Sequence, residues 1–228
     1  MSPHKPSCEV CRGQYEIADV GPVFDLCQGH REEYGKLAAE KALREIIPAG
    51  FHHAHPRDLP EALRGWNATA GTGLYIYGKV GAGKSHTAAA IMKRGYMQQM
   101  KAGQYPTCAW VNLPVAIMDT LAAISAKRDA SMLWTQAQNS SLLVLDDIGV
   151  EQPKEWVRAR LYALIETRLH GRLPTIVTSN LDLGSLAERL DSPQIASRLS
   201  QMCAQVSFEN SNDRRLSLAP SITPSTEG

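Results

Sequence analysis

Short apolar runs alternate with longer stretches of helical composition along most of the chain. The apolar runs are rich in β-branched and aromatic residues and predict strands at 74–77, 109–112, 142–146, 175–179 and 204–208. The stretches between and after them predict helices at 84–101, 115–126, 155–170, 184–190 and 193–202. Strands that alternate with helices predict an α/β fold of three layers, in which helices cover both faces of a mainly parallel five-stranded sheet.

The two ends of the chain differ in composition from this alternating part. Residues 1–30 are rich in Cys, Pro and Gly, and a helix is expected at 31–47, ending before Pro48. The last ten residues are rich in Pro, Ser and Thr, which is typical of a disordered tail. The domains are therefore expected at 1–47 (an N-terminal module with a linker helix), 48–218 (the main domain) and 219–228 (the tail).

Composition and charge exclude several classes of function. No apolar run reaches the length of a membrane span, and the first residues are charged rather than an apolar leader, so a cytoplasmic protein is expected. The 24 Lys and Arg residues nearly balance the 23 Asp and Glu residues, for a formal net charge of +1. This balance predicts no overall basic surface, so any contact with nucleic acid must come from a local patch or from an oligomer.

The segment after the first expected strand carries the strongest chemical signal. Its sequence, GKVGAGKS, fits the phosphate-binding pattern G-x-x-x-x-G-K-[ST] between a strand and a helix. Glycines let backbone N–H groups turn toward a phosphate, and the helix N-terminus adds partial positive charge. Lys84 can reach the β- and γ-phosphates, and the Ser85 hydroxyl can ligate Mg²⁺. The expected ATP-binding residues are Gly78, Gly81, Ala82, Gly83, Lys84, Ser85, His86 and Asp146.

Two carboxylates follow the apolar run at 142–145. The carboxyl end of a buried parallel strand is where ligands bind in such sheets, so Asp146 is expected to hold Mg²⁺, directly or through water. Asp147 is a candidate for the group that activates water, although its side chain is one methylene shorter than the Glu found at this place in many ATPases. The alternative is that the two acids cap the next segment.

A polar residue also ends the expected strand at 175–179. Asn180 could orient the attacking water or touch the γ-phosphate, and it is a candidate catalytic residue on that ground. Taken alone, an Asn after a strand is most often a turn residue. Its position after the two earlier motifs makes the catalytic interpretation more specific.

The N-terminal region contains two close pairs of metal-binding residues. Cys8-x-x-Cys11 and Cys27-x-x-His30 have the spacing of a tetrahedral Zn²⁺ site, and metal would supply folding energy to a segment too short for its own core. The alternative is free cysteines in a loop. Cys108 and Cys203 lie at the starts of expected strands and are interpreted as small buried apolar residues.

These motifs together resemble a known family. GKVGAGKS, LLVLDDIG, PTIVTSNL and QIASRL follow one another as in the AAA+ ATPases of the bacterial helicase-loader group, the DnaC/DnaI type, which is related to DnaA and to the IstB transposition ATPases. The resemblance covers roughly residues 46–216, and the run YALIETRLHGRLPTIVTSNL favours the loader branch. It implies that Arg198 is a catalytic finger that reaches the γ-phosphate of a neighbouring subunit, and that Arg214 or Arg215 senses nucleotide.

The resemblance implies a function, with alternatives. A loader would use ATP and Mg²⁺ to control a hexameric replicative DNA helicase, assemble into an AAA+ oligomer and contact single-stranded DNA. Only residues 209–228 follow the last expected strand, too few for the helical lid domain of many AAA+ proteins. DnaI-type loaders carry an N-terminal zinc domain that binds the helicase, which favours a loader over an IstB-like accessory ATPase for transposition. A third hypothesis is a binding module with a degenerate ATP site.

Overall fold

The computed structural model describes residues 28–150 and 154–208, with side chains described from Gly35 onward. The chain divides into two compact units, Met1–Glu45 and Ile46–Gly228. The described part of the first unit is helix α1, which runs over Gln28–Ile46 and confirms the helix expected at 31–47. The nucleotide motifs all belong to the second unit.

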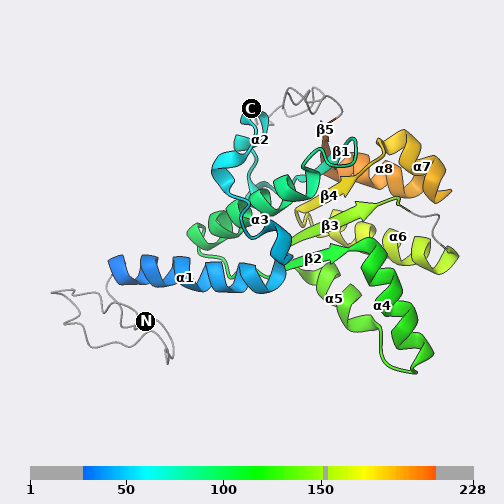
Figure 1. Cartoon of the computed structure of the whole chain (residues 1–228), viewed down its shortest axis with the longest axis horizontal. Coiled ribbons are helices and arrows are strands. Elements are labelled where there is room, and N and C mark those ends of the chain that lie inside the picture. The colour runs from blue at the N-terminus through cyan, green and yellow to red at the C-terminus, as the bar shows by residue number, and fades with distance from the viewer. Residues whose placement is uncertain (1–27, 151–153, 209–228) are drawn as a thin grey trace. The chain divides into compact units, whose positions relative to one another are not determined.

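A five-stranded parallel sheet forms the centre of the second unit. Its strands are β1 (Gly73–Tyr77), β2 (Cys108–Asn112), β3 (Leu142–Ile148), β4 (Thr175–Ser179) and β5 (Cys203–Ser207). They lie in the order β2-β3-β4-β1-β5, and every neighbouring pair is parallel (Figure 1). This arrangement confirms the predicted α/β class and places β1, β3 and β4 side by side in the middle of the sheet.

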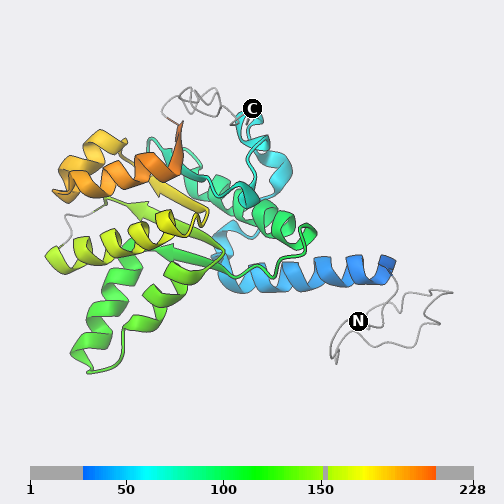
Figure 2. The same ribbon diagram turned by 180° about the vertical axis from the view of Figure 1, so that it is seen from behind.

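Helices cover both faces of the sheet, as Figures 1 and 2 show from opposite sides. One face carries α3 (Lys84–Lys101) and, around it, four short helical segments: η2 (Ala49–Phe51), η3 (Pro56–Asp58), α2 (Glu61–Arg64) and η4 (Ala68–Ala70). The other face carries α4 (Leu113–Ser125), α5 (Ser131–Asn139), α6 (Glu155–His170), α7 (Leu183–Leu190) and α8 (Pro193–Met202).

Burial on both faces explains why the central strands are apolar throughout. In β3, the four residues from Leu142 to Leu145 are all 0% exposed. A half-exposed strand would instead alternate apolar and polar residues. Each fully buried aliphatic side chain of this kind stabilises the fold by about 1.5–3 kcal/mol, so the sheet holds the polar strand ends in a rigid frame.

The described structure differs from the predicted elements around α4 and α5. Helix α4 begins two residues earlier than expected because the Asn112 side chain accepts a hydrogen bond from the Val115 N–H at 3.2 Å and caps it. Helix α5 was not predicted, since its sequence has little apolar periodicity. It is fixed instead by Trp134, a buried residue whose indole N–H donates to the Thr120 hydroxyl at 3.1 Å.

Three further residues with sulfur or polar side chains are buried. Cys108 and Cys203 are buried free thiols, as predicted from their places at strand starts. Arg168 of α6 is also fully buried, and its guanidinium donates to carbonyl oxygens of Ala137 and Pro174, each at 2.8 Å. Burial lowers the pKa of Arg168 to about 10. These hydrogen bonds tie α6 to α5 and to the start of β4.

Candidate functional site

The glycine-rich segment forms a tight loop between β1 and α3. Gly81 and Gly83 have φ angles of 81° and 88°, in the left-handed region that glycine adopts without strain. Gly83 is the residue immediately before helix α3, which begins at Lys84. The loop therefore stands at the N-terminus of an 18-residue helix, where free backbone N–H groups and the helix dipole attract anions.

The Lys84 side chain is held across the mouth of this loop. Its ammonium group donates to the carbonyl oxygens of Gly78 and Lys79, each at 2.9 Å, and to Oδ1 of Asn180 at 2.8 Å. Lys84 is only 5% exposed. Burial lowers the pKa of Lys84, and the charges of Asp147 and Asp146 act in the opposite direction. The ammonium is thus positioned over the loop by three acceptors, and a phosphate arriving there would be a stronger, charged acceptor.

Asp146, a residue of β3, contacts the residue after Lys84. The Ser85 hydroxyl donates to Oδ1 of Asp146 at 2.7 Å, and the Thr178 hydroxyl donates to the same oxygen at 2.6 Å. Asp146 is only 3% exposed. A hydroxyl next to a carboxylate is the hard oxygen donor set that Mg²⁺ prefers, so the residues present fit this ion. These contacts go to side chains of α3 and β4, and none of them caps the next segment.

Asp147 has an unusual backbone. Its φ is 61°, and the pairing of β3 with β4 shifts register between Leu145 and Ile148. Burial and the neighbouring Asp146 raise the pKa of Asp147, and the Lys84 ammonium acts in the opposite direction. Asp147 also lines a groove of about 140 Å³ whose other walls come mainly from α4 and the start of α6. The carboxylate therefore stands between the loop and an apolar groove.

Asn180 and His86 complete the residues near the loop. Asn180 follows β4 directly, and its side chain accepts from Lys84 rather than forming a local turn. His86 stands in the first turn of α3, and its ring centroid lies 5.0 Å from that of His53. The structure thus brings together Lys84, Asn180, Ser85 and Asp146 through hydrogen bonds, while His86 contacts a histidine from the segment before β1.

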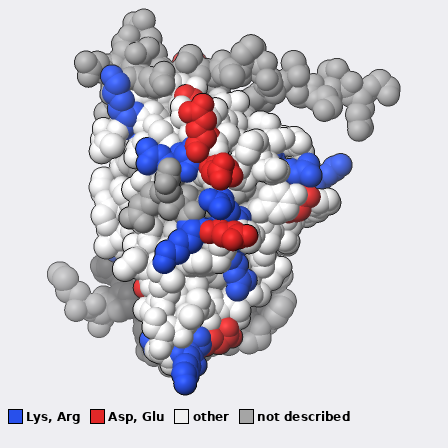
Figure 3. All heavy atoms as spheres, turned by 90° about the vertical axis from the view of Figure 1, so that its right-hand side faces the viewer, with Lys and Arg blue, Asp and Glu red and all other residues white. Residues whose placement is uncertain are grey.

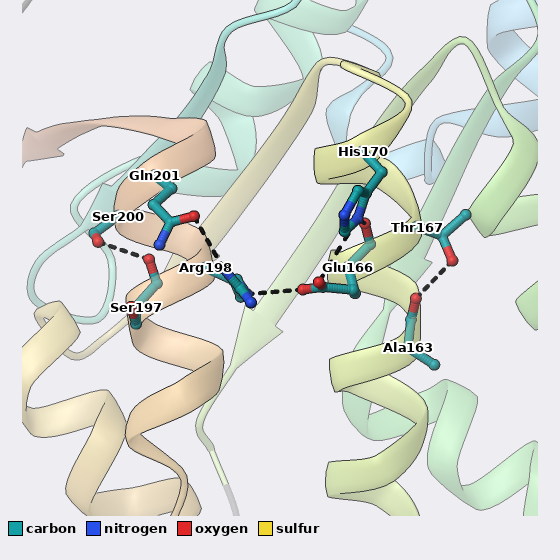
Figure 4. A network of polar contacts seen from close by, with 8 residues as sticks. All are labelled: Ala163, Glu166, Thr167, His170, Ser197, Arg198, Ser200 and Gln201. Carbon is teal, nitrogen blue, oxygen red and sulfur yellow. Dashed lines mark hydrogen bonds and ion pairs between the residues drawn. The ribbon is translucent and has the colours of Figure 1, made fainter.

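Arg198 lies in a different set of contacts (Figure 4). Its guanidinium Nε is 2.8 Å from Oε2 of Glu166 on α6, and Nη1 donates to Oε1 of Gln201 at 3.2 Å. Contacts with Tyr162 and with Glu166 raise the pKa of Arg198. In the described part of the chain Arg198 therefore pairs with residues of its own subunit, and its role as a finger toward a neighbour stays a prediction.

The expected zinc ligands are not covered by the structure. Cys8, Cys11 and Cys27 lie outside the described residues, as do Arg214, Arg215 and the tail; His30 falls within α1, but its side chain is not described. Within residues 28–150 and 154–208 no cluster of three or more His, Cys, Asp or Glu residues could hold a metal ion. The zinc site therefore stays a prediction.

Sequence reasoning missed Thr178. It is the fourth of the five residues of β4 and contacts both the Asp146 carboxylate and the Asp147 backbone N–H. Hydroxyl side chains in a strand expected to be buried were the available signal, because a buried polar side chain needs a hydrogen-bond partner. The sequence could not show which partner.

The strand–glycine loop–helix unit at the centre of a parallel sheet is typical of P-loop nucleotide-binding folds. The fold is shared with a crystal structure of the DnaC helicase loader, with a TM-score of 0.59, 22% identity and coverage of 70% of this chain and 99% of that one. A candidate primosome component from Streptococcus pyogenes gives a TM-score of 0.58 at 22% identity, covering 75% of this chain and 96% of that one.

In sequence, the chain is similar to the replicative helicase loader DnaI of Bacillus subtilis. The two are 26% identical over 169 residues, which is 68% of this chain and 52% of DnaI. The chain thus spans about half the length of this curated relative. No protein-family model matches the chain. None of the described helices combines the length and the apolar character that crossing a membrane requires.

Proposed function

We propose that this protein is an ATPase that loads a replicative DNA helicase during the initiation of replication. The observation that carries the proposal is the linked set Lys84–Asn180 and Ser85–Asp146 around the glycine loop of a DnaC-like fold. The sequence similarity to DnaI, named as a replicative helicase loader, supports the same function. Intact lysine, serine, aspartate and asparagine at these places disfavour a degenerate site.

Under this proposal, each residue of the nucleotide site has a separate task. The loop N–H groups and Lys84 would hold the β- and γ-phosphates, and Asn180 would exchange its contact with Lys84 for one with the γ-phosphate or the attacking water. Ser85 and Asp146 would hold Mg²⁺, which neutralises charge on the phosphates when bound. Asp147 would accept a proton from the attacking water, a role that its raised pKa favours.

Hydrolysis would require a second subunit. Arg198 would leave Glu166 and place its guanidinium against the γ-phosphate of a neighbour, where it stabilises transition-state charge. Because Arg198 pairs with Glu166 and Gln201 within its own subunit, an isolated subunit is expected to be a poor ATPase. Self-association into an AAA+ oligomer is therefore part of the proposal.

The N-terminal module would bind the helicase. Cys8, Cys11, Cys27 and His30 would hold a structural Zn²⁺, and the module would grip the partner while the core binds ATP. Contact with single-stranded DNA would come from basic residues gathered in the oligomer. On the face that Figure 3 shows, Lys and Arg side chains are interspersed with Asp and Glu. This face of a single subunit therefore does not gather positive charge for DNA by itself.

The test is co-purification with the hexameric replicative helicase encoded by the same genome, using the full-length chain with ATP and Mg²⁺. Retention of the helicase is expected for the wild-type chain and loss for a Cys8→Ser/Cys11→Ser variant that still binds ATP. If the wild-type chain hydrolyses ATP but never retains the helicase, the loader function is wrong. Retention of a transposase instead would favour the alternative, an IstB-like accessory ATPase.

A further inference from the structure

One hydroxyl contacts both acidic residues at the end of β3. The Thr178 hydroxyl donates a hydrogen bond of 2.6 Å to Oδ1 of Asp146 and accepts one of 3.0 Å from the backbone N–H of Asp147. Thr178 is 0% exposed. A hydroxyl has one donor and two acceptor lone pairs, so it can make both bonds at once.

The backbone at Asp147 needs this acceptor. Pairing of β3 with β4 is interrupted between Leu145 and Ile148, and Asp147 has a φ of 61°. At such an irregularity the extra residue loses its ladder partner, and a buried N–H without an acceptor is costly. The Thr178 oxygen takes the place of the missing strand carbonyl, so it stabilises the irregular stretch of β3 that contains Asp147.

The Asp146 carboxylate is oriented by the same contact. Its Oδ1 receives hydrogen bonds from Ser85 on α3 and from Thr178 on β4. Two donors on one oxygen fix the rotation of the carboxylate plane, which a single donor would leave freer. Ser85 would turn its lone pair toward Mg²⁺ on nucleotide binding, whereas Thr178 keeps its bond to Oδ1.

Thr178 also lies two residues before Asn180, the residue after β4 that accepts from Lys84 at 2.8 Å. The contacts Lys84–Asn180, Thr178–Asp146 and Asp146–Ser85 therefore close a ring through α3, β4 and β3. A shift of β4 would therefore change the surroundings of both the Lys84 ammonium and the Asp146 carboxylate.

We infer that Thr178 is a positioning residue of the nucleotide site, which orients the Asp146 carboxylate for Mg²⁺ and holds the backbone of β3 at the irregularity that contains Asp147. The inference rests on the proposed ATP binding, because it concerns the same site. The Thr178 hydroxyl would contact neither nucleotide nor metal. It would set the geometry of Asp146 and Asp147, which are expected to contact the metal and the attacking water.

The experiment measures how Mg²⁺ concentration controls the affinity of the full-length protein for a fluorescent ATP analogue. Thr178→Val keeps the shape of the side chain and removes the hydroxyl, whereas Thr178→Ser keeps the hydroxyl. A lost hydrogen bond to a charged group corresponds to about a tenfold effect or more. We expect the half-saturating Mg²⁺ concentration to rise by about that factor in Thr178→Val and to stay within about twofold of wild type in Thr178→Ser.

Thr120→Val is the matched control, since Thr120 is a buried threonine of α4 whose hydroxyl donates to the Ala116 carbonyl at 2.7 Å. It should lower the melting temperature without changing the Mg²⁺ dependence. If Thr178→Val does not fold, Thr178→Ala provides the same test at a smaller side chain. Unchanged Mg²⁺ dependence in a folded variant without the hydroxyl overturns the inference alone, while a wild-type chain that binds no nucleotide overturns the proposed function with it.

Discussion

Asn180 accepts a hydrogen bond of 2.8 Å from the ammonium group of Lys84, a residue 96 positions earlier in the chain. The contact joins the loop after β1 to the end of β4, its neighbour in the sheet. Parallel pairing of β1 with β4 therefore holds the strand-end amide next to the expected phosphate-binding lysine. Substitutions of the residues around the glycine loop should therefore affect ATP binding and ATP hydrolysis to different extents.

Lys84→Ala should weaken ATP binding. A contact between an ammonium and a phosphate is charge-assisted, and its loss costs about 1.5–3 kcal/mol, or about 10- to 150-fold in Kd. Titration with a fluorescent ATP analogue measures the change. Lys79→Ala is the control, because Lys79 is an exposed lysine of the same loop and its removal should change Kd by less than about threefold. Equal affinity in Lys84→Ala and wild type would contradict the assigned role of Lys84.

Asp147→Asn should reduce hydrolysis and preserve ATP binding. The amide cannot accept a proton from water, and loss of a general base lowers rates by roughly 10²–10⁴-fold. Rate and affinity are measured on the same assembled protein, with phosphate release for the rate. If affinity for Mg²⁺ and ATP falls as much as the rate does, Asp147 is a metal ligand instead.

The same substitution should stabilise the free protein at neutral pH. Burial and Asp146 raise the pKa of Asp147 above its unfolded value, so its favourable contribution is present below the unfolded pKa and is lost as pH rises through the folded one. Asn stays neutral throughout and tolerates the left-handed φ of 61°. We expect a melting temperature about 1–3 °C higher than wild type at pH 7, with the gap narrowing toward pH 4.

Thermal melts across pH measure this difference. Asp119→Asn, at an exposed position of α4, is the control and should leave the melting temperature nearly constant at each pH. A lower melting temperature for Asp147→Asn at pH 7 would contradict this prediction, because it would mean that the surroundings favour the ionised form of Asp147.

Arg198→Ala mixed with Lys84→Ala should recover part of the ATPase activity that each variant lacks. Some interfaces in the mixture would join an intact loop to an intact arginine from the neighbour. Arg189→Ala is the control, because it removes an exposed arginine of α7. This variant should retain its ATPase activity without mixing. Failure to recover activity at any ratio, with both variants folded and assembling, would exclude a finger in trans.

Glu166→Gln tests the contact that holds Arg198 within its own subunit. The ion pair of 2.8 Å is partly exposed, with 35% and 25% of the two side chains accessible, so its contribution is small. Removing the charge should raise the ATPase rate at low protein concentration by about two- to fivefold, since the guanidinium is freer to leave. A reduced rate would mean that Glu166 orients the arginine toward the neighbour instead.

Zinc should bind at about one ion per chain through Cys8, Cys11, Cys27 and His30. Removing it with a chelator should unfold the N-terminal module, because metal binding supplies the folding energy of so short a segment. Metal analysis and circular dichroism of the purified chain provide the measurement. Metal-free protein with its full helical content would exclude a structural zinc site.

The sequence by itself determined the class of fold and the nucleotide loop. Strands β1, β3 and β4 are buried on both faces, so their apolar runs stood out between helical stretches. The loop was recognisable because backbone N–H groups can wrap a phosphate only where glycine allows a positive φ, as at Gly81 and Gly83. Both signals are local, so no knowledge of distant neighbours was needed.

Only the tertiary structure decided how the polar residues pair. The contacts of the Thr178 hydroxyl, the positive φ of Asp147 within β3 and the ion pair of Arg198 with Glu166 depend on which strands and helices lie side by side. Helix α5 likewise depends on the contact of Trp134 with Thr120 rather than on its own periodicity. The sequence could name candidate groups, but a hydrogen bond between segments far apart in the chain is set by packing, which brings each donor within reach of one acceptor among many.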